Sequence, residues 1–262
     1  MASAAGGIDV TYGIENKVAI VTGPGGFGAG YCRGLADAGA SVVVADTAES
    51  GGATLEELRS AGREAFLIET DVTSEASARD MANEVGERFG GADILVNNAA
   101  MFQGLPFPPP DPIEEMPLEL WNRVLTVNLT SVFIVSRAVI PLMRERGGVI
   151  INQSSPAVWQ NSPGRMHYTV AKGALLPMTR SMARELAPAH IRVNAIAPGP
   201  VVAGDMGGID AKMADRMTER MAIKRLGTPE DLVGPLLFLA SKMSAWMTGQ
   251  VLVVDGGGFM VG

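Results

Sequence analysis

The 262-residue sequence has one cysteine and two histidines, and only 5 % of its residues are aromatic. A single cysteine, Cys32, excludes an internal disulfide and is typical of a reducing compartment. No Cys, His, Asp and Glu residues cluster at the spacing of metal ligands. We therefore expect a reduced protein without a catalytic metal.

The chain also lacks a basic run, and its net charge is −7 with a pI of about 5.0. An acidic chain of this kind is a poor partner for nucleic acid. The first 17 residues have neither the basic start nor the apolar core of a signal peptide, and no apolar stretch suggests a membrane span. The expected protein is cytoplasmic, with no nucleic-acid or membrane partner.

Short β-branched runs alternate with longer segments of helical periodicity, such as 74–89, 119–146, 169–187 and 229–243. Several runs are apolar on both faces, as a parallel sheet covered by helices requires. The pattern predicts an α/β fold with a single domain over residues 1–262, of which residues 1–14 form an N-terminal extension. We expect a Rossmann-like, doubly wound parallel sheet of seven strands, at 17–22, 41–46, 64–69, 92–97, 148–153, 191–196 and 250–255.

Two stretches interrupt this alternation. Residues 104–117 contain six prolines and cannot be regular structure. They form either a rigid surface loop or one wall of a substrate cleft. Residues 201–224 become a helix with Met213, Met217 and Met221 on one face. That face either packs in the core or forms a mobile flap over an apolar substrate.

A glycine-rich loop, Gly23-x-Gly25-x-x-Gly28, follows the first strand and opens a predicted helix. Backbone N–H groups and the helix dipole favour phosphate at such a place. Asp46 ends the next strand, where an acid can accept hydrogen bonds from an adenosine ribose and repel a 2′-phosphate. The loop and the acid together predict binding of NAD, although Asp46 alone is also compatible with a helix cap.

The second constellation is Tyr168-x-x-x-Lys172, with Ser155 upstream. On a helix, Lys172 lies one turn beyond Tyr168 on the same face. A nearby ammonium lowers the pKa of a phenol, which can then exchange a proton with a substrate hydroxyl or carbonyl. A serine hydroxyl beside it can polarise the same oxygen.

With these motifs in order, the chain resembles the short-chain dehydrogenase/reductase (SDR) family over roughly residues 15–258. The resemblance also rests on "NNAA" (97–100), "VNLTS" (127–131), "PGPV" (198–201), "RLGTPEDL" (225–232) and "TGQVLVVDGG" (248–257). It implies that Ser155 polarises the substrate oxygen, that Tyr168 is the general acid/base, and that Lys172 also binds the nicotinamide ribose. It further implies that Asn128 holds a water in the proton relay.

The same resemblance implies a set of cofactor contacts. Asp71 and Val72 would flank the adenine, although Asp71 could instead cap a helix. Asn98, Ala99 and Ala100 would pass beside the cofactor, and Pro198, Gly199 and Val201 would lie near the nicotinamide carboxamide. The loop contacts would come from Gly23, Gly25, Gly26, Phe27 and Gly28.

The chain departs from the family pattern in its glycine loop. Two alignments compete, one ending at Gly30 and one at Gly28, and the helix end at 35–40 favours Gly28. The loop is then one residue short, with Phe27 where isoleucine is common. Ala100 replaces a usual glycine, and Ala203 replaces a threonine that often binds the carboxamide.

These features predict an NAD-dependent oxidoreductase that interconverts a secondary alcohol and a ketone. A 3-oxoacyl-thioester reductase is the alternative within the family. A dinucleotide-sensing protein without catalysis and a nucleotide-independent lyase are alternatives of other classes. The resemblance also implies a homotetramer with residues 229–257 at an interface. The expected substrate pocket is mostly apolar and draws on Met101, Phe102, Trp159, Met166, His167 and Met206.

Overall fold

The computed structural model of the chain describes residues 12–101, 112–160, 164–202 and 211–260. Its centre is one sheet of seven parallel strands in the order β3-β2-β1-β4-β5-β6-β7. The reversal of order between β1 and β4 is the mark of a doubly wound sheet, and the predicted fold class is confirmed. The strands are β1 (Val18–Thr22), β2 (Ser41–Asp46), β3 (Ala65–Glu69), β4 (Ile94–Asn97), β5 (Gly148–Gln153), β6 (Ile191–Pro198) and β7 (Val251–Val254).

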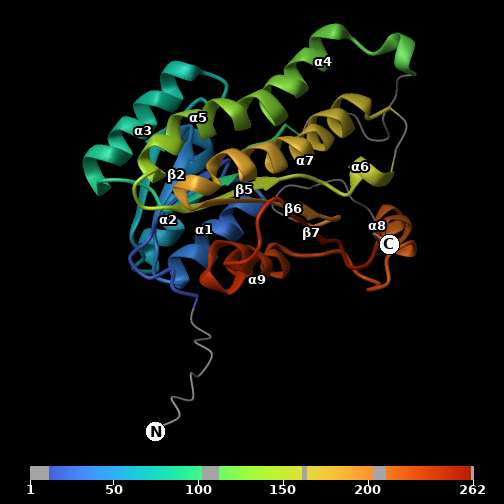
Figure 1. Cartoon of the computed structure of the whole chain (residues 1–262). Helices are drawn as coiled ribbons and strands as arrows, with labels where there is room; N and C mark the ends of the chain where they lie inside the picture. The colour runs from blue at the N-terminus through green and yellow to red at the C-terminus, as the bar shows by residue number, and fades with distance from the viewer. Residues whose placement is uncertain (1–11, 102–111, 161–163, 203–210, 261–262) are drawn as a thin grey trace, which may run out of the picture.

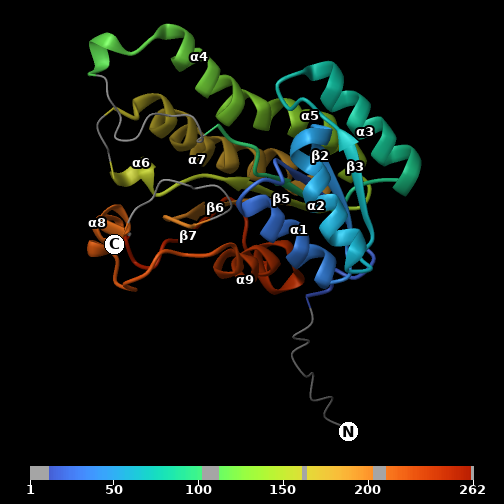
Figure 2. The same cartoon turned by 180° about the vertical axis from the view of Figure 1, so that it is seen from behind.

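Helices connect the strands and cover both faces of the sheet (Figures 1 and 2). Helices α3, α5 and α7 lie on one face, and α1 and α9 lie on the other. The helices are α1 (Phe27–Asp37), α2 (Ala48–Ser60), α3 (Glu75–Phe89), α4 (Leu118–Leu125), α5 (Ser131–Met143), α6 (Ala157–Gln160), α7 (Met166–Leu186), α8 (Ala211–Glu219) and α9 (Pro229–Ala240). Short 3₁₀ turns occupy Ile113–Glu115, Ala187–Ala189 and Lys242–Ser244.

The core divides into two layers because successive strand residues point to opposite faces. Ala19 and Val21 of β1 pack with α1 and α9 in one layer. Val18 and Ile20 pack with α3, α5 and α7 in the other. The central strands are therefore apolar on both sides, which is the pattern that the sequence predicted.

Local capping explains where several helices begin. The Ser74 side chain accepts a hydrogen bond from the Ser77 N–H at the start of α3, and Thr47 does the same for Ser50 at the start of α2. At α9, Thr228 and Asp231 form a capping box in front of Pro229 at the first helical position.

Helices α4 and α5 form one continuous helix, Leu118–Met143, joined by a π-helical turn at Thr126–Thr130. By length and composition this helix could cross a membrane, but a core helix passes the same test. Packing buries part of it, because α5 lies against α3 and the sheet while α4 lies against α7, whereas Leu118 and Phe133 stay exposed.

Helix α1 and helix α9 pack closely through two glycines. A Cβ atom at Gly30 would lie 2.9 Å from the Pro229 Cβ, and one at Gly34 would lie 2.5 Å from the Val233 Cγ1. An ion pair of 3.1 Å between Arg33 and Glu230 joins the same helices. The helix that follows the glycine loop is therefore seated on the last helix of the chain.

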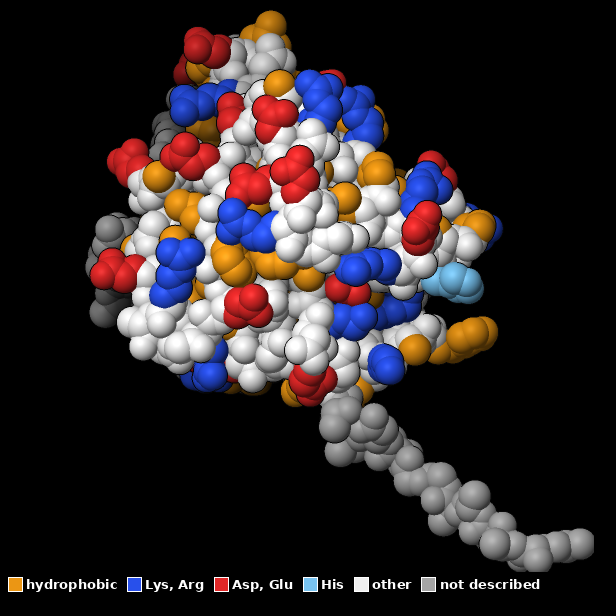
Figure 3. Space-filling view, turned by 90° about the vertical axis from the view of Figure 1, so that its left-hand side faces the viewer, with side chains coloured by type: hydrophobic (Ala, Val, Ile, Leu, Met, Phe, Trp, Pro, Cys, Tyr) orange, Lys and Arg blue, Asp and Glu red, His pale blue; other side chains and the backbone are white. Residues whose placement is uncertain are grey.

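The face of the molecule seen in Figure 3 carries acidic and basic side chains interspersed with apolar ones. No broad basic surface is visible on that face.

Candidate active site

Most of the predicted functional residues lie at the carboxyl ends of β1 to β6 or in the loops that follow them, while Tyr168 and Lys172 lie in α7 and Asn128 lies in the π-helical turn before α5. All strands are parallel, so these loops leave the sheet at the same edge, where open α/β sheets bind ligands. The fold thus brings segments far apart in the sequence to one site.

The glycine loop needs its glycines for two different reasons. Gly23 has a φ of +65°, and a Cβ there would lie 2.5 Å from the Ala99 Cα. A Cβ at Gly28 would lie 2.1 Å from the Gly23 carbonyl oxygen. Gly26, with a φ of 60°, is the N-cap of α1. Gly25 is exposed and has nothing within 4 Å of its Cβ position, so this side of the loop is open to a ligand.

Helix α1 begins at Phe27, which is half-buried against the core. Gly23, Gly26 and Gly28 are constrained by the loop itself, whereas Gly30 is constrained by packing against α9. This arrangement agrees with the shortened loop that the sequence favoured.

Thr22, which the sequence analysis did not assign to the site, holds the loop against the end of β4. Its hydroxyl oxygen accepts hydrogen bonds of 3.1 Å from both the Asn98 and the Ala99 N–H groups. The Asn98 side-chain amide donates to the Gly23 carbonyl. Ala100 is exposed just beyond this turn. The two predicted cofactor segments are therefore one hydrogen-bonded unit.

Asp46 lies at the end of β2, and its Oδ1 accepts a hydrogen bond of 2.7 Å from the Thr47 N–H. Burial raises the pKa of this carboxyl, and the hydrogen bonds from Thr47 act in the opposite direction. Asp71 follows β3, and its Oδ1 accepts from both the N–H and the hydroxyl of Thr73. Asp71 thus fixes the turn before α3, whose N-cap is Ser74, so it does not cap the helix as the alternative expected. Val72 packs on the core beside it.

Ser155 and Tyr168 are hydrogen-bonded through their side chains. Tyr168 is buried in a small cluster with Val124, Met101 and Ala157. Burial raises the pKa of the Tyr168 phenol, while the Ser155 hydrogen bond and the charge of Arg165 lower it. The sequence analysis expected a net lowering, and the structure differs because removal from water is the largest effect.

Lys172 is 1 % exposed, and its Nζ donates a hydrogen bond of 2.8 Å to the Gln153 carbonyl. Burial lowers its pKa to about 7. The expected ammonium that stabilises the Tyr168 phenolate is thus partly neutral near pH 7. Arg165 is a second cation near Tyr168, and its charge lowers the pKa of the phenol.

Arg165 is the N-cap residue of α7 and is 8 % exposed. It lies one helical turn before Tyr168, a spacing that places both residues on one face. The sequence signal was present in this spacing, but an arginine before a helix is ordinarily interpreted as a surface residue.

Asn128 lies in the π-helical turn, and its amide donates hydrogen bonds of 3.1 Å to the carbonyls of Met101 and Val124. The side-chain oxygens of Asn98, Asn128 and Gln153 are buried and lack hydrogen-bond partners among the described residues. Buried polar atoms of this kind usually have partners. These three oxygens can accept hydrogen bonds from the donor groups of a nicotinamide dinucleotide or from its waters, and the open side of Gly25 leaves space for such a ligand.

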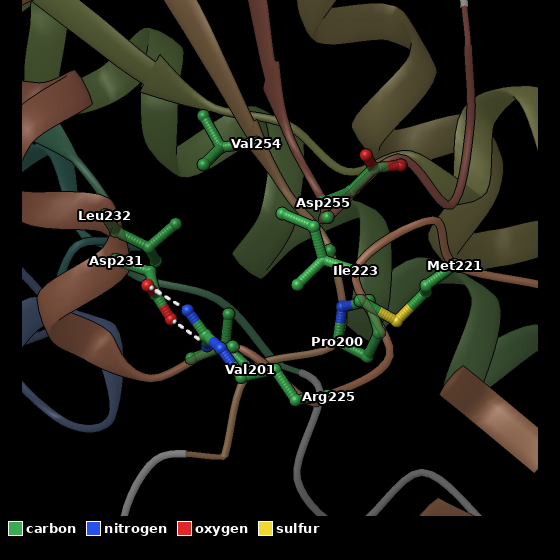
Figure 4. A pocket seen from close by; sticks show the side chains of 12 residues that line it. Pro200, Val201, Met221, Ile223, Arg225, Asp231, Leu232, Val254 and Asp255 are labelled. Atoms are coloured by element: carbon green, nitrogen blue, oxygen red, sulfur yellow. Dashed lines mark hydrogen bonds and ion pairs between the residues drawn. The ribbon is translucent and has the colours of Figure 1, made fainter. Parts of the chain in front are cut away.

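Pro198 is the last residue of β6, and Gly199 and Val201 follow it. A Cβ at Gly199 would lie 2.5 Å from the Asp255 Cβ, so this loop is pressed against the end of β7. A pocket of about 150 Å³ lies next to it (Figure 4). Arg225 and Asp231 form one side of the pocket with hydrogen bonds of 2.6 and 2.8 Å. Ser155, Tyr168 and Lys172 do not line this pocket, so it is separate from the predicted catalytic residues.

Four of the six predicted substrate residues lie in the part of the chain that the structure describes. Met101 contacts the Tyr168 cluster, and Met166 is 37 % exposed at the start of α7. His167 is 3 % exposed, and its Nδ1 accepts a hydrogen bond from the Tyr168 N–H, which does not support a substrate contact. Trp159 lies on α6 and is stacked on Phe259.

Other predictions fall outside the described residues. Phe102, Ala203 and Met206 lie there, as does most of the proline-rich stretch. Of the predicted flap, the structure describes α8, and Met221 after it is buried and lines the pocket of Figure 4. Within the described ranges, no group of three or more His, Cys, Asp or Glu side chains is placed to hold a metal.

Comparison with known proteins agrees with this geometry. A family model described as enoyl-(acyl carrier protein) reductase matches residues 21–258. An uncharacterized oxidoreductase of Mycobacterium tuberculosis is 41 % identical over 247 residues, which cover 93 % of this chain and 97 % of that protein. The 7alpha-hydroxysteroid dehydrogenase of Escherichia coli is 35 % identical over 94 % of this chain and 95 % of its own length. A solved short-chain dehydrogenase/reductase from Serratia marcescens superposes with a TM-score of 0.85 at 34 % identity, covering 94 % of this chain and 98 % of that one.

Proposed function

Because the chain belongs to the short-chain dehydrogenase/reductase family, we propose that it is an NAD-dependent enzyme that interconverts a secondary alcohol and a ketone. The observation that carries the proposal is the hydrogen-bonded pair Ser155 and Tyr168 beside the buried Lys172. The name of the E. coli relative points the same way, since a 7-hydroxyl on a steroid ring is a secondary alcohol.

The roles of the chain's own residues follow from their contacts. The Ser155 hydroxyl would orient the substrate oxygen, and Tyr168 would take up its proton during oxidation or return it during reduction. Lys172 and Arg165 would supply the positive charge that favours the phenolate. The glycine loop would hold the phosphates of the cofactor and residues 198–201 its nicotinamide, which would supply or accept the hydride.

Asp46 is the basis for proposing NAD rather than NADP. A carboxylate at the end of β2 can accept hydrogen bonds from the ribose hydroxyls, and it would repel a 2′-phosphate. Oxidation of the alcohol is the direction that this cofactor favours in cells that hold an excess of oxidised NAD.

The first test is a titration of the purified protein with NADH and with NADPH, in which energy transfer from tryptophan to the nicotinamide reports binding. We expect tight binding of NADH and weak binding of NADPH. Tyr168→Phe is then assayed with NAD and a panel of secondary alcohols. We expect at least a thousandfold loss of turnover with NADH binding kept. A variant that oxidises alcohols normally would exclude this mechanism.

A 3-oxoacyl-thioester reductase is the second candidate, favoured by the family model's description, which names the acyl carrier protein. Reductases of biosynthesis generally use NADPH, so a preference for NADPH in the same titration would promote this candidate. Binding of neither nucleotide would favour the lyase, and binding without turnover would favour the sensor.

We also propose a homotetramer in the cytoplasm. Leu118, Phe133 and Val170 are exposed apolar residues of α4, α5 and α7, and Trp246 is fully exposed between α9 and β7. Such residues suit burial between copies of the chain. Light scattering during size-exclusion chromatography would give the mass, and a monomer would contradict the proposal. The buried Cys32 thiol fits a reducing compartment.

A further inference from the structure

The last described residues of the chain form a tight turn built around Asp255. This buried carboxylate accepts hydrogen bonds of 3.0 Å from the Gly257 N–H and 2.7 Å from the Phe259 N–H. Gly256 and Gly257 have φ values of +64° and +73°, which side chains rarely adopt. The turn therefore has one defined conformation, and it fixes the backbone of Phe259.

The turn is also fixed from outside. The Ile223 N–H donates a hydrogen bond of 2.9 Å to the Gly256 carbonyl, and the Gly199 N–H donates one of 2.9 Å to the Val254 carbonyl. A Cβ at Gly256 would lie 2.7 Å from the Met221 Cε, so the segment after α8 is packed directly on the turn. The turn is thus attached to the predicted nicotinamide loop.

This turn presents the Phe259 ring to α6. The rings of Phe259 and Trp159 are stacked with centroids 5.1 Å apart and planes 9° from parallel. Trp159 belongs to the short helix that begins just after Ser155, and its N–H donates a hydrogen bond of 3.0 Å to the Pro156 carbonyl. In Figures 1 and 2 the C-terminus, α6 and α8 lie together at one end of the molecule.

Both rings are half-buried, so the stack still presents apolar aromatic surface. Ser155 is connected to the Trp159 ring through α6, and residues 198–201 are connected to the Phe259 ring through the Asp255 turn. Stacked rings held on both sides form a rigid, flat surface, unlike the flexible methionines elsewhere around the site.

We propose that the Trp159–Phe259 stack is the aromatic wall of the substrate site and that Phe259 selects secondary alcohols whose hydroxyl-bearing carbon lies in a carbocyclic ring. This inference rests on the proposed alcohol and ketone activity. A saturated ring can place one whole face of C–H groups on the wall at little entropic cost. An open chain must first lose several rotations to do the same.

The kinetic test compares cyclohexanol with 2-hexanol, two secondary alcohols of equal carbon number. For Phe259→Leu we expect kcat/KM for cyclohexanol to fall about three- to tenfold more than kcat/KM for 2-hexanol. Trp159→Phe, which keeps a stackable ring, should retain most of the preference for the cyclic alcohol. The control is Met260→Leu, because Met260 is the adjacent residue and is 73 % exposed. It should leave the preference unchanged.

Equal loss for both alcohols in Phe259→Leu, with NADH affinity unchanged, would overturn the proposal and leave the stack as an anchor of the tail. A preference that survives intact in Phe259→Leu would overturn it as well. Thermal melts of each variant show whether a loss reflects unfolding instead, and Phe259→Tyr, with a ring of the same shape, must then restore the preference.

A binding measurement separates this proposal from the activity on which it rests. The protein is labelled with 5-fluorotryptophan, and the Trp159 resonance is assigned among Trp121, Trp159 and Trp246 with Trp159→Phe. We expect cyclohexanone to shift the Trp159 signal at lower concentration than 2-hexanone does, and Phe259→Leu to remove this difference. If wild-type protein turns over no alcohol, the proposed activity fails, while this titration still tests whether the Trp159–Phe259 stack binds the cyclic ketone. An unchanged Trp159 signal would overturn it.

Discussion

The Lys172 ammonium donates a hydrogen bond of 2.8 Å to the Gln153 carbonyl, and the Ser154 hydroxyl donates one of 2.9 Å to the Lys172 carbonyl. The two bonds run in opposite directions between α7 and the end of β5. They fix the lysine at both its backbone and its side chain, and they place Ser155 relative to Tyr168. Ser154, which the sequence analysis did not select, is therefore a positioning residue.

Ser154→Ala removes one of these two bonds. We expect a loss of about 1 kcal/mol in the free energy of unfolding, since the Lys172 carbonyl loses a buried partner. We also expect a several-fold fall in kcat with little change in KM, because the catalytic pair is held less firmly. Urea unfolding and steady-state kinetics measure the two effects. A fall in stability with unchanged kcat would reduce Ser154 to a structural role.

Lys172 should make stability depend on pH. Burial lowers its pKa from 10.5 to about 7, so the unfolded chain binds the proton more tightly than the folded one. Stability therefore rises with pH between about 7 and 10.5, and this gain is lost as pH falls toward 7. Relative to Lys172→Met, wild type should gain up to about 1 kcal/mol per pH unit in that range. Urea unfolding at several pH values tests this, with the exposed Lys212→Met as a control. If the difference in unfolding free energy between wild type and Lys172→Met stays constant over this pH range, the lowered pKa of Lys172 is contradicted.

Arg165 should control the pH dependence of activity. Its charge lowers the pKa of Tyr168, so Arg165→Gln should raise that pKa and move the rise of alcohol oxidation to higher pH. Arg165→Lys keeps the charge and should move the profile back. On the same helix, Lys172 and His167 also titrate near Tyr168, while Val124, Met101 and Ala157 around its ring are uncharged.

The measurement for Arg165 is kcat/KM against pH at saturating NAD. A profile that stays in place in Arg165→Gln, with turnover merely reduced, would show that the arginine acts on folding of the α7 terminus instead. The same profile for His167→Gln serves as the comparison.

Two glycines of the loop should respond differently to alanine. A Cβ at Gly25 meets open space, so Gly25→Ala should keep the melting temperature and weaken NADH binding. A Cβ at Gly28 would lie 2.1 Å from the Gly23 carbonyl oxygen, so Gly28→Ala should lower stability by about 2 kcal/mol or more as well as binding. Melting curves and NADH titrations distinguish the two. Equal effects on stability would mean that the open side of the loop has been assigned wrongly.

Asp46 should set the choice of nucleotide. Asp46→Asn should weaken NADH binding about tenfold through loss of charged hydrogen bonds, and it should bring the affinity for NADPH closer to that for NADH. Fluorescence titration with both nucleotides measures the ratio. Glu49→Gln, an exposed acid in the first turn of α2, is the matched control and should leave the ratio unchanged.

The strands, their parallel arrangement and the edge where the predicted site residues gather follow from patterns that are strong in the sequence. Runs such as 41–46 are apolar on both faces, and parallel topology alone then gathers the loops at one edge. The spacing of Tyr168 and Lys172 likewise predicts a shared helical face, because four residues make about one turn.

The contacts between segments distant in sequence could not be predicted in this way. Thr22 joins the glycine loop to Asn98, and the Phe259 ring meets Trp159 across 100 residues of chain. The expected lowering of the Tyr168 pKa failed for the same reason, since its sign depends on how completely the fold removes the phenol from water. Local spacing contains no measure of that burial.

The close packing of α1 on α9 has a consequence for how the protein comes to be made. Among the described residues, Pro229 and Val233 fill the groove formed by Gly30 and Gly34, yet about 200 residues separate the two helices along the chain. When a ribosome has synthesised the first half of the chain, the helix after the glycine loop therefore does not yet have this packing partner. We expect a product truncated before α9 to hold the loop less firmly and to expose the glycine groove to chaperones.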